Sequence, residues 1–164
     1  MLKGRATIAA LLFGAAVSAC SGSGAPCSEP DAGPTLDRTM VTPNPDQTIV
    51  MTASTTFSVA DAVSEPCTGT APLAYYWFIN YPGNGLPEYA SGTAAAGLDS
   101  LKIDPCAAKF RDLYGLVSGA PRVVELFVMD PTKGTVRFDT QYGRVFNGPN
   151  GYVLWNLDVQ AVCP

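Results

Sequence analysis

Two segments have the sequence pattern of β-strands and limit the fold classes open to this chain. Residues 73–80 are dense in aromatic and β-branched side chains, and Trp77 and Tyr76 point to opposite faces of such a strand. Residues 122–129 alternate in the same way, with Leu126 on the face that repeats every second residue. Strands of this kind bury one face against a second layer, so the two segments indicate an all-β domain.

Turn-forming residues separate these strands from shorter ones. The chain contains 16 glycines and 14 prolines, and only 15% of its residues are charged. Alternating apolar residues predict further strands at 49–51, 56–60, 98–103, 135–138 and 152–162. About seven short strands with turns between them predict an immunoglobulin-like antiparallel β-sandwich. We expect Trp77 and Trp155 to anchor its core, and one or two helical turns at 106–114 to bury Phe110 and Leu113.

Two motifs resemble those of a known family. Tyr75-Tyr76-Trp77-Phe78 on one strand, and the run Val124–Asp130 followed by Gly134, are similar to the strand pair of PKD-like domains of exported bacterial proteins. The resemblance implies a β-sandwich used for adhesion, spacing or binding, and no catalysis. The Asp-Phe-Gly-Asp-Gly that commonly follows the tryptophan in that family is absent, and residues 79–83 differ from it.

The N-terminus has the three zones of a secretory signal. Lys3 and Arg5 provide the positive start, residues 6–17 are almost wholly apolar, and small residues follow. The apolar run is shorter than the roughly 20 residues that a membrane-spanning helix needs. We therefore interpret residues 1–19 as a cleaved signal peptide.

The end of this segment resembles the lipobox of bacterial lipoproteins. Val17-Ser18-Ala19-Cys20 has the small residues and the cysteine of that motif, although its usual first residue is Leu. The resemblance implies that cleavage precedes Cys20 and that the cysteine carries diacylglycerol and an acyl chain such as palmitate. Ser21 then favours the outer membrane over inner-membrane retention. The alternative is an ordinary signal peptide that leaves Cys20 as a disulfide partner.

The mature chain divides into a tether and one domain. Residues 20–45 are rich in Ser, Gly, Pro and Ala and contain few large apolar residues, so we expect a lipidated flexible tether. Residues 46–164 hold the predicted strands and suit a single β-sandwich domain.

The cysteine count fits this division. Of the five cysteines, Cys20 is assigned to lipid, and an oxidising compartment then allows two disulfides among the other four. We expect Cys67–Cys106 together with Cys27–Cys163, although four cysteines permit three sets of pairings.

Composition argues against several functions. The formal net charge is −4, and loss of Lys3 and Arg5 leaves about −6, so nucleic-acid binding is not expected. The chain has no histidine, which removes the commonest general base and most zinc sites. No nucleophile elbow or phosphate-binding loop is present, and we expect neither an enzyme nor a bound cofactor or metal.

Carboxylates offer two weaker possibilities. Asp61, Glu65 and Asp130 follow strands that end on the same side of such a sandwich, but their spacing matches no calcium loop, and ordinary turn carboxylates explain them. Glu88 and Asp99 could be invoked as a glycosidase pair, as could two carboxylates of any acidic chain.

The outer face of the two strong strands is the predicted partner-binding patch. If Trp77 points inward, Tyr76, Phe78 and Phe127 point outward, and exposed aromatic clusters mark binding surfaces. Alternatively, residues 86–120 fold over this face. The sequence thus favours a membrane-anchored, non-enzymatic module that binds an envelope or surface protein, and the alternative is a carbohydrate-binding or glycan-hydrolysing envelope protein.

Overall fold

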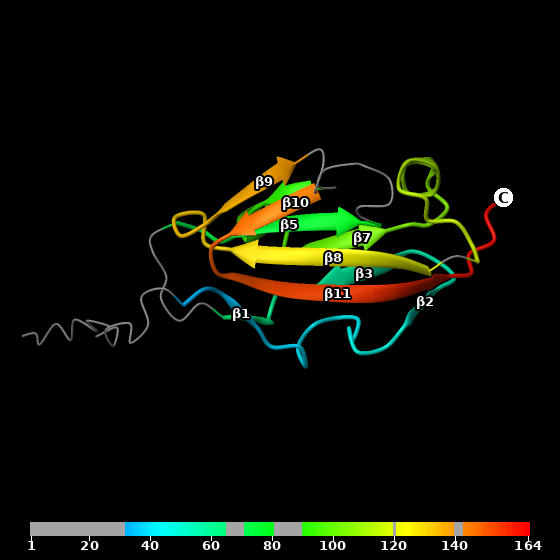
Figure 1. Cartoon of the computed structure of the whole chain (residues 1–164). Coiled ribbons are helices and arrows are strands. Elements are labelled where there is room, and N and C mark those ends of the chain that lie inside the picture. Colours follow the sequence, from blue (N-terminus) through cyan, green and yellow to red (C-terminus); the bar gives the residue numbers. More distant parts are fainter. Residues whose placement is uncertain (1–31, 65–70, 81–89, 120, 140–142) are drawn as a thin grey trace, which may run out of the picture.

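The computed structural model describes residues 32–64, 71–80, 90–119, 121–139 and 143–164, and the regular secondary structure of this part is almost entirely β-strand (Figure 1). The all-β prediction is confirmed. The described part holds eleven strands where about seven were expected, because several pairings span only two or three residues. In chain order the strands are β1 (Thr35–Leu36), β2 (Ile49–Met51), β3 (Thr55–Ser58), β4 (Val63–Ser64), β5 (Ala74–Ile79), β6 (Ala90–Gly92), β7 (Ser100–Ile103), β8 (Pro121–Met129), β9 (Thr135–Asp139), β10 (Gly143–Asn147) and β11 (Asn150–Val159).

A five-stranded sheet forms the centre of the domain, in the order β2-β11-β8-β5-β6. The strands β5, β8 and β11 are antiparallel neighbours, and β2 joins the sheet parallel to β11. Trp77 lies opposite Leu126, and Trp155 lies opposite Val124. The period-two pattern of the sequence therefore places both tryptophans on the same face of this sheet.

The core lies between this face and the paired strands β3 and β7. Both tryptophans are completely buried and stack with their ring centroids 5.8 Å apart, and the Phe57 ring of β3 meets Trp155 edge-on. Each indole N–H has a partner, since Trp77 donates to the carbonyl oxygen of Leu98 and Trp155 to that of Pro43. The prediction that these tryptophans anchor the core is confirmed.

The packed domain begins before residue 46, where the sequence placed its start. Val41 is buried in the core, and Thr42 exchanges two backbone hydrogen bonds with Ser58 of β3. Pro43 accepts the indole bond of Trp155, and β1 pairs with β4. The segment from Pro34 to Pro45 is therefore part of the domain and not of a flexible tether. Most of the hydrogen bonds that hold this segment are made by its backbone groups.

The helical turn expected at 106–114 is a π-helix, Lys109–Leu113. Phe110 is buried as predicted, but Leu113 is 51% exposed. A π-helix closes each turn with an i to i+5 hydrogen bond, so residues three apart do not share a face as closely as in an α-helix.

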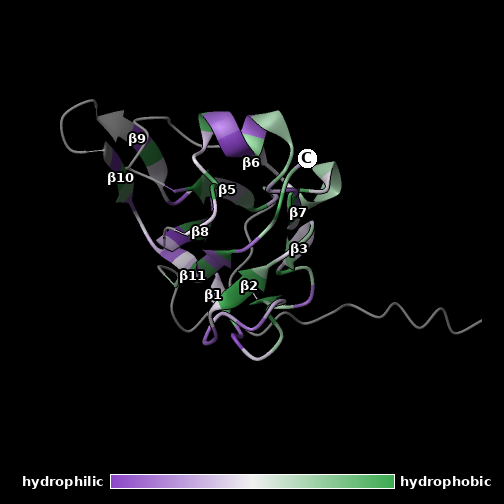
Figure 2. Ribbon diagram, turned by 90° about the vertical axis from the view of Figure 1, so that its right-hand side faces the viewer, coloured by the Kyte–Doolittle hydropathy of each residue, from purple (hydrophilic) through white to green (hydrophobic). Residues whose placement is uncertain are grey.

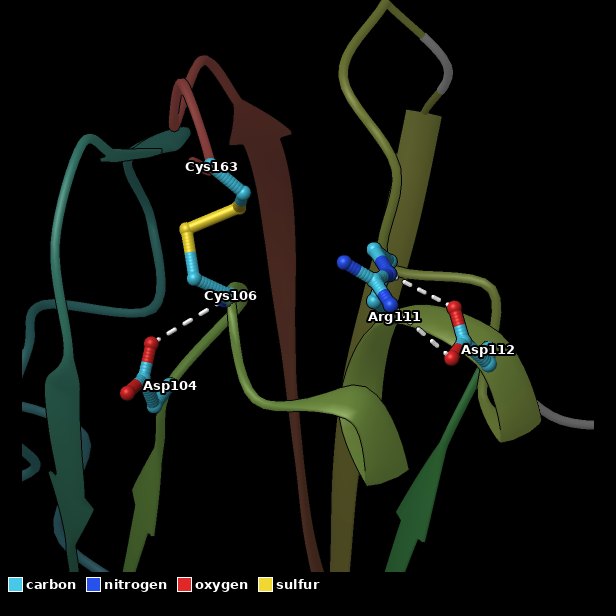
Figure 3. The surroundings of a disulfide bond; sticks show 5 residues. All are labelled: Asp104, Cys106, Arg111, Asp112 and Cys163. Carbon is cyan, nitrogen blue, oxygen red and sulfur yellow. Dashed lines mark hydrogen bonds and ion pairs between the residues drawn. A yellow bond between two sulfur atoms is a disulfide. The ribbon is translucent and has the colours of Figure 1, made fainter.

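One disulfide joins described cysteines, and it is neither of the predicted pairs. Cys106 bonds Cys163 with the Cα atoms 5.2 Å apart (Figure 3). The pairing follows from the fold, because β7 and β11 end on the same side of the domain shortly before these cysteines (Figure 1). Cys27 and Cys67 lie outside the described residues, but the predicted pairs Cys67–Cys106 and Cys27–Cys163 are both excluded.

Candidate functional site

The outer face of the five-stranded sheet carries the three aromatic residues singled out from the sequence. Tyr76 lies opposite Phe127 in the register of β5 and β8, and Phe78 follows two residues later on the same face. The three side chains are thus brought together as predicted. Their exposure differs from the prediction, since Phe78 is completely buried and Tyr76 and Phe127 are half-buried.

The β9–β10 hairpin covers this aromatic face. Figure 2 shows the hairpin on one side of the central strands β8 and β11, with β3 and β7 on the other. The Phe146 ring of β10 stacks on Phe127 with centroids 3.8 Å apart, and it also meets Tyr76 and Phe78 edge-on. A segment does cover the patch, and among the described residues it includes the hairpin strand β10. The described residues therefore place a largely covered aromatic cluster at these positions.

An ion pair is buried beneath the hairpin. Glu125 of β8 is 5% exposed, and its carboxylate accepts hydrogen bonds from the Arg144 guanidinium and from the Tyr152 hydroxyl. The same guanidinium lies over the Phe78 and Phe127 rings, 4.4 and 5.0 Å from their centroids. Burial and the bond to Glu125 raise the pKa of Tyr152 well above its usual value, which keeps the phenol protonated. The only sequence signal for this network was a glutamate in an otherwise apolar strand.

The other end of the same face is open. A groove of about 640 Å³ lies where β5 and β11 end and β8 begins. It is lined by Thr48, Asn80, Gly119, Pro121, Arg122, Val123, Asn156, Leu157 and Asp158. No sequence pattern indicates this groove, because its polar residues come from four separate segments and none forms a motif.

Backbone carbonyls hold Arg122 at the groove. Its guanidinium donates to the carbonyl oxygens of Gly115 and Pro121. Asn80, which has a positive φ of 52°, donates from its amide to the carbonyl oxygen of Tyr114. The loop between β7 and β8 is thus tied to the groove by side chains from the sheet.

The carboxylates considered for calcium do not form a cation site in the described residues. Asp61 is exposed, whereas Asp130 is completely buried and accepts hydrogen bonds from the backbone N–H and the hydroxyl of Thr132. These bonds lower the pKa of Asp130, and the Lys133 Nζ atom lies 3.9 Å from its Oδ2 atom. No group of three potential metal ligands is found among the residues with described positions. Glu65 lies outside them.

Several other predicted residues also fall outside the described ranges. They include the signal peptide, Cys20 and Glu88. Because Glu88 is one of them, no described contact joins it to Asp99, the other residue considered for a glycosidase pair. No helix within the described ranges is long and apolar enough to span a membrane.

Comparison with known proteins identifies no relative of this chain. No family model matches it, and neither a curated protein nor a solved structure is significantly similar.

Proposed function

We propose that this protein is an exported lipoprotein, anchored through lipid on Cys20, whose domain is a non-enzymatic protein-binding or assembly module of the cell envelope. We also propose an outer-membrane location, because Ser21 is the residue that follows the lipobox. The groove on the outer face of the sheet is the observation that carries the binding function, since concave sites with a few convergent polar groups are the usual places for ligands.

We further propose that the domain is an immunoglobulin-like sandwich of the PKD-like kind. The neighbours β5, β8 and β11 correspond to strands C, F and G of that fold, and the pair β3–β7 corresponds to strands B and E. The buried Trp77 on β5 supports the assignment, because immunoglobulin domains carry a buried tryptophan on strand C.

The position of the groove supports a docking role. Lys133, in the turn after β8, donates to the carbonyl oxygen of Ala32, which marks the end of the domain nearest the proposed anchor. The groove lies at Pro121 and Arg122, where β8 begins. Eight residue steps along an antiparallel strand span about 27 Å, so the groove lies at the opposite end of β8 from Ala32, where the described chain begins.

Site-specific crosslinking in intact cells tests the docking role. A photoreactive amino acid at the exposed groove residue Asn156 should form adducts with an envelope protein, identified by mass spectrometry. The same residue at exposed Val145, on the hairpin, should form few. Adducts at Val145 alone would move the surface to the hairpin, and absence of adducts at both positions would refute protein docking.

The anchor needs its own test. Mass spectrometry of the membrane fraction should find Cys20 as a diacylated N-terminal residue. A Cys20→Ala protein that still partitions fully with membranes would overturn the lipoprotein assignment.

A further inference from the structure

We propose that the groove binds a carboxylate-bearing segment of a protein partner, with Arg122 as the residue that receives the carboxylate. The inference rests on the proposed docking function and names the chemistry of its partner. It is carried by the contacts of Arg122 and by the mixture of polar groups around it.

The guanidinium of Arg122 is held in place by groups that do not neutralise its positive charge. Two backbone carbonyls, of Gly115 and Pro121, accept from its Nε and Nη1 atoms, and it forms no ion pair with any described carboxylate. Among the other described arginines, Arg38, Arg111 and Arg144 each pair with an acidic side chain, whereas Arg137 forms no such pair but is exposed on the hairpin. A half-buried guanidinium fixed by neutral acceptors keeps its charge and further N–H donors for a ligand, and its fixed position lowers the entropy lost on binding.

The remaining lining favours a peptide over a simple anion. Asp158 lies in the same groove, and its carboxylate accepts one hydrogen bond from Gln160. Phosphate or sulfate offers mainly acceptor oxygens, so Asp158 would repel it. A peptide offers a carboxylate for Arg122 together with backbone N–H donors for Asp158 and for the amide oxygens of Asn80 and Asn156.

Peptide binding to the mature chain provides the test. The probes are synthetic peptides on an array, each made once with Glu or Asp and once with Gln or Asn in its place, and affinities of the best binders are measured by fluorescence anisotropy. We expect the acidic member of a bound pair to bind at least about tenfold more tightly, the size of one charge-assisted hydrogen bond. Arg122→Gln should remove that preference.

A second variant keeps the test valid if Arg122→Gln fails to fold. Asn156→Asp places another carboxylate on the exposed side of β11, two residues from Asp158, and should weaken acidic peptides at least about tenfold. Asn147→Asp is the matched control, because it adds the same charge at an exposed position at the end of the hairpin strand β10 and should leave affinity unchanged.

Each contrary outcome is decisive. The inference is overturned if no acidic peptide binds the natural chain more tightly than it binds the Asn156→Asp variant. Equal binding of the acidic and amide peptides would also overturn it. Effective competition by inorganic phosphate would indicate a plain anion site instead. The photoreactive amino acid at position 156 can also be placed in the Arg122→Gln protein. If it then crosslinks to a partner equally well, the docking function stands and only its carboxylate chemistry is wrong.

Discussion

Side chains, and not a shared backbone ladder, hold the β9–β10 hairpin to the domain. In the described residues the two strands pair with each other and with no strand of the central sheet. The Arg144 and Glu125 side chains are 14% and 6% exposed. Removing one partner of a buried ion pair costs about 3–5 kcal/mol, because the other charge is left without compensation. The bond that Tyr152 still donates to Glu125 offsets about 1 kcal/mol, so Arg144→Met should lower the free energy of unfolding by about 3 kcal/mol.

Urea unfolding followed by tryptophan fluorescence measures this loss, and thermal unfolding should show a decrease in Tm of about 10 °C. The double variant Glu125→Leu with Arg144→Met removes both charges and should regain most of the stability, since apolar replacements of whole buried pairs are often neutral or stabilising. The control is Arg38→Met, which breaks an exposed pair with Asp46 and should cost no more than about 0.5 kcal/mol.

Two results would refute this reasoning. A loss below about 1 kcal/mol for Arg144→Met would show that the ion pair does not hold the hairpin. Additive losses in the double variant would show that the two side chains stabilise the domain independently.

Three further predictions concern the disulfide and the pH dependence of stability. The disulfide closes a segment of 57 residues, so replacing Cys106 and Cys163 by Ser should cost about 4 kcal/mol in urea unfolding, and a loss under about 1 kcal/mol would contradict the chain-entropy argument. Because the pKa of Tyr152 is raised, its phenol should stay protonated past pH 10.0 in a near-ultraviolet titration and the fold should lose stability as the pH rises further, whereas Glu125→Gln should bring its ionisation nearer to that of ordinary tyrosines. The lowered pKa of Asp130 stabilises the fold above about pH 4 and this contribution disappears as the pH falls, so Asp130→Asn should flatten the acid side of the stability profile, and an unchanged slope would contradict the assignment.

Periodicity predicted the inner half of the molecule well. The alternation in residues 73–80, 122–129 and 152–162 predicted which side chains face the core, and both tryptophans lie where that pattern placed them. A strand that buries one face constrains its register strongly, because a shift by one residue would expose every apolar side chain of that face.

The outer half depended on tertiary contacts that periodicity does not encode. Val136 and Phe146 lie opposite each other in the hairpin, but nothing in their local pattern says which sheet face they will cover. The groove was equally inaccessible, since Asn80, Arg122 and Asp158 meet only after three strands have aligned. The disulfide was predicted wrongly for the same reason, because pairing depends on which strand ends lie together and not on spacing along the chain.

The parallel pairing of β2 with β11 has a consequence for the order in which the domain folds. Leu157 pairs with Ile49, so residues from opposite parts of the sequence must meet before the central sheet is complete. A chain emerging from a translocation channel with its N-terminal part first cannot close this sheet until β11 has also passed through. Such non-local contacts slow folding, and in the proposed export they would help to keep the polypeptide unfolded during transit. In the export that we propose, the order of the strands would thus delay folding until the domain has crossed the membrane.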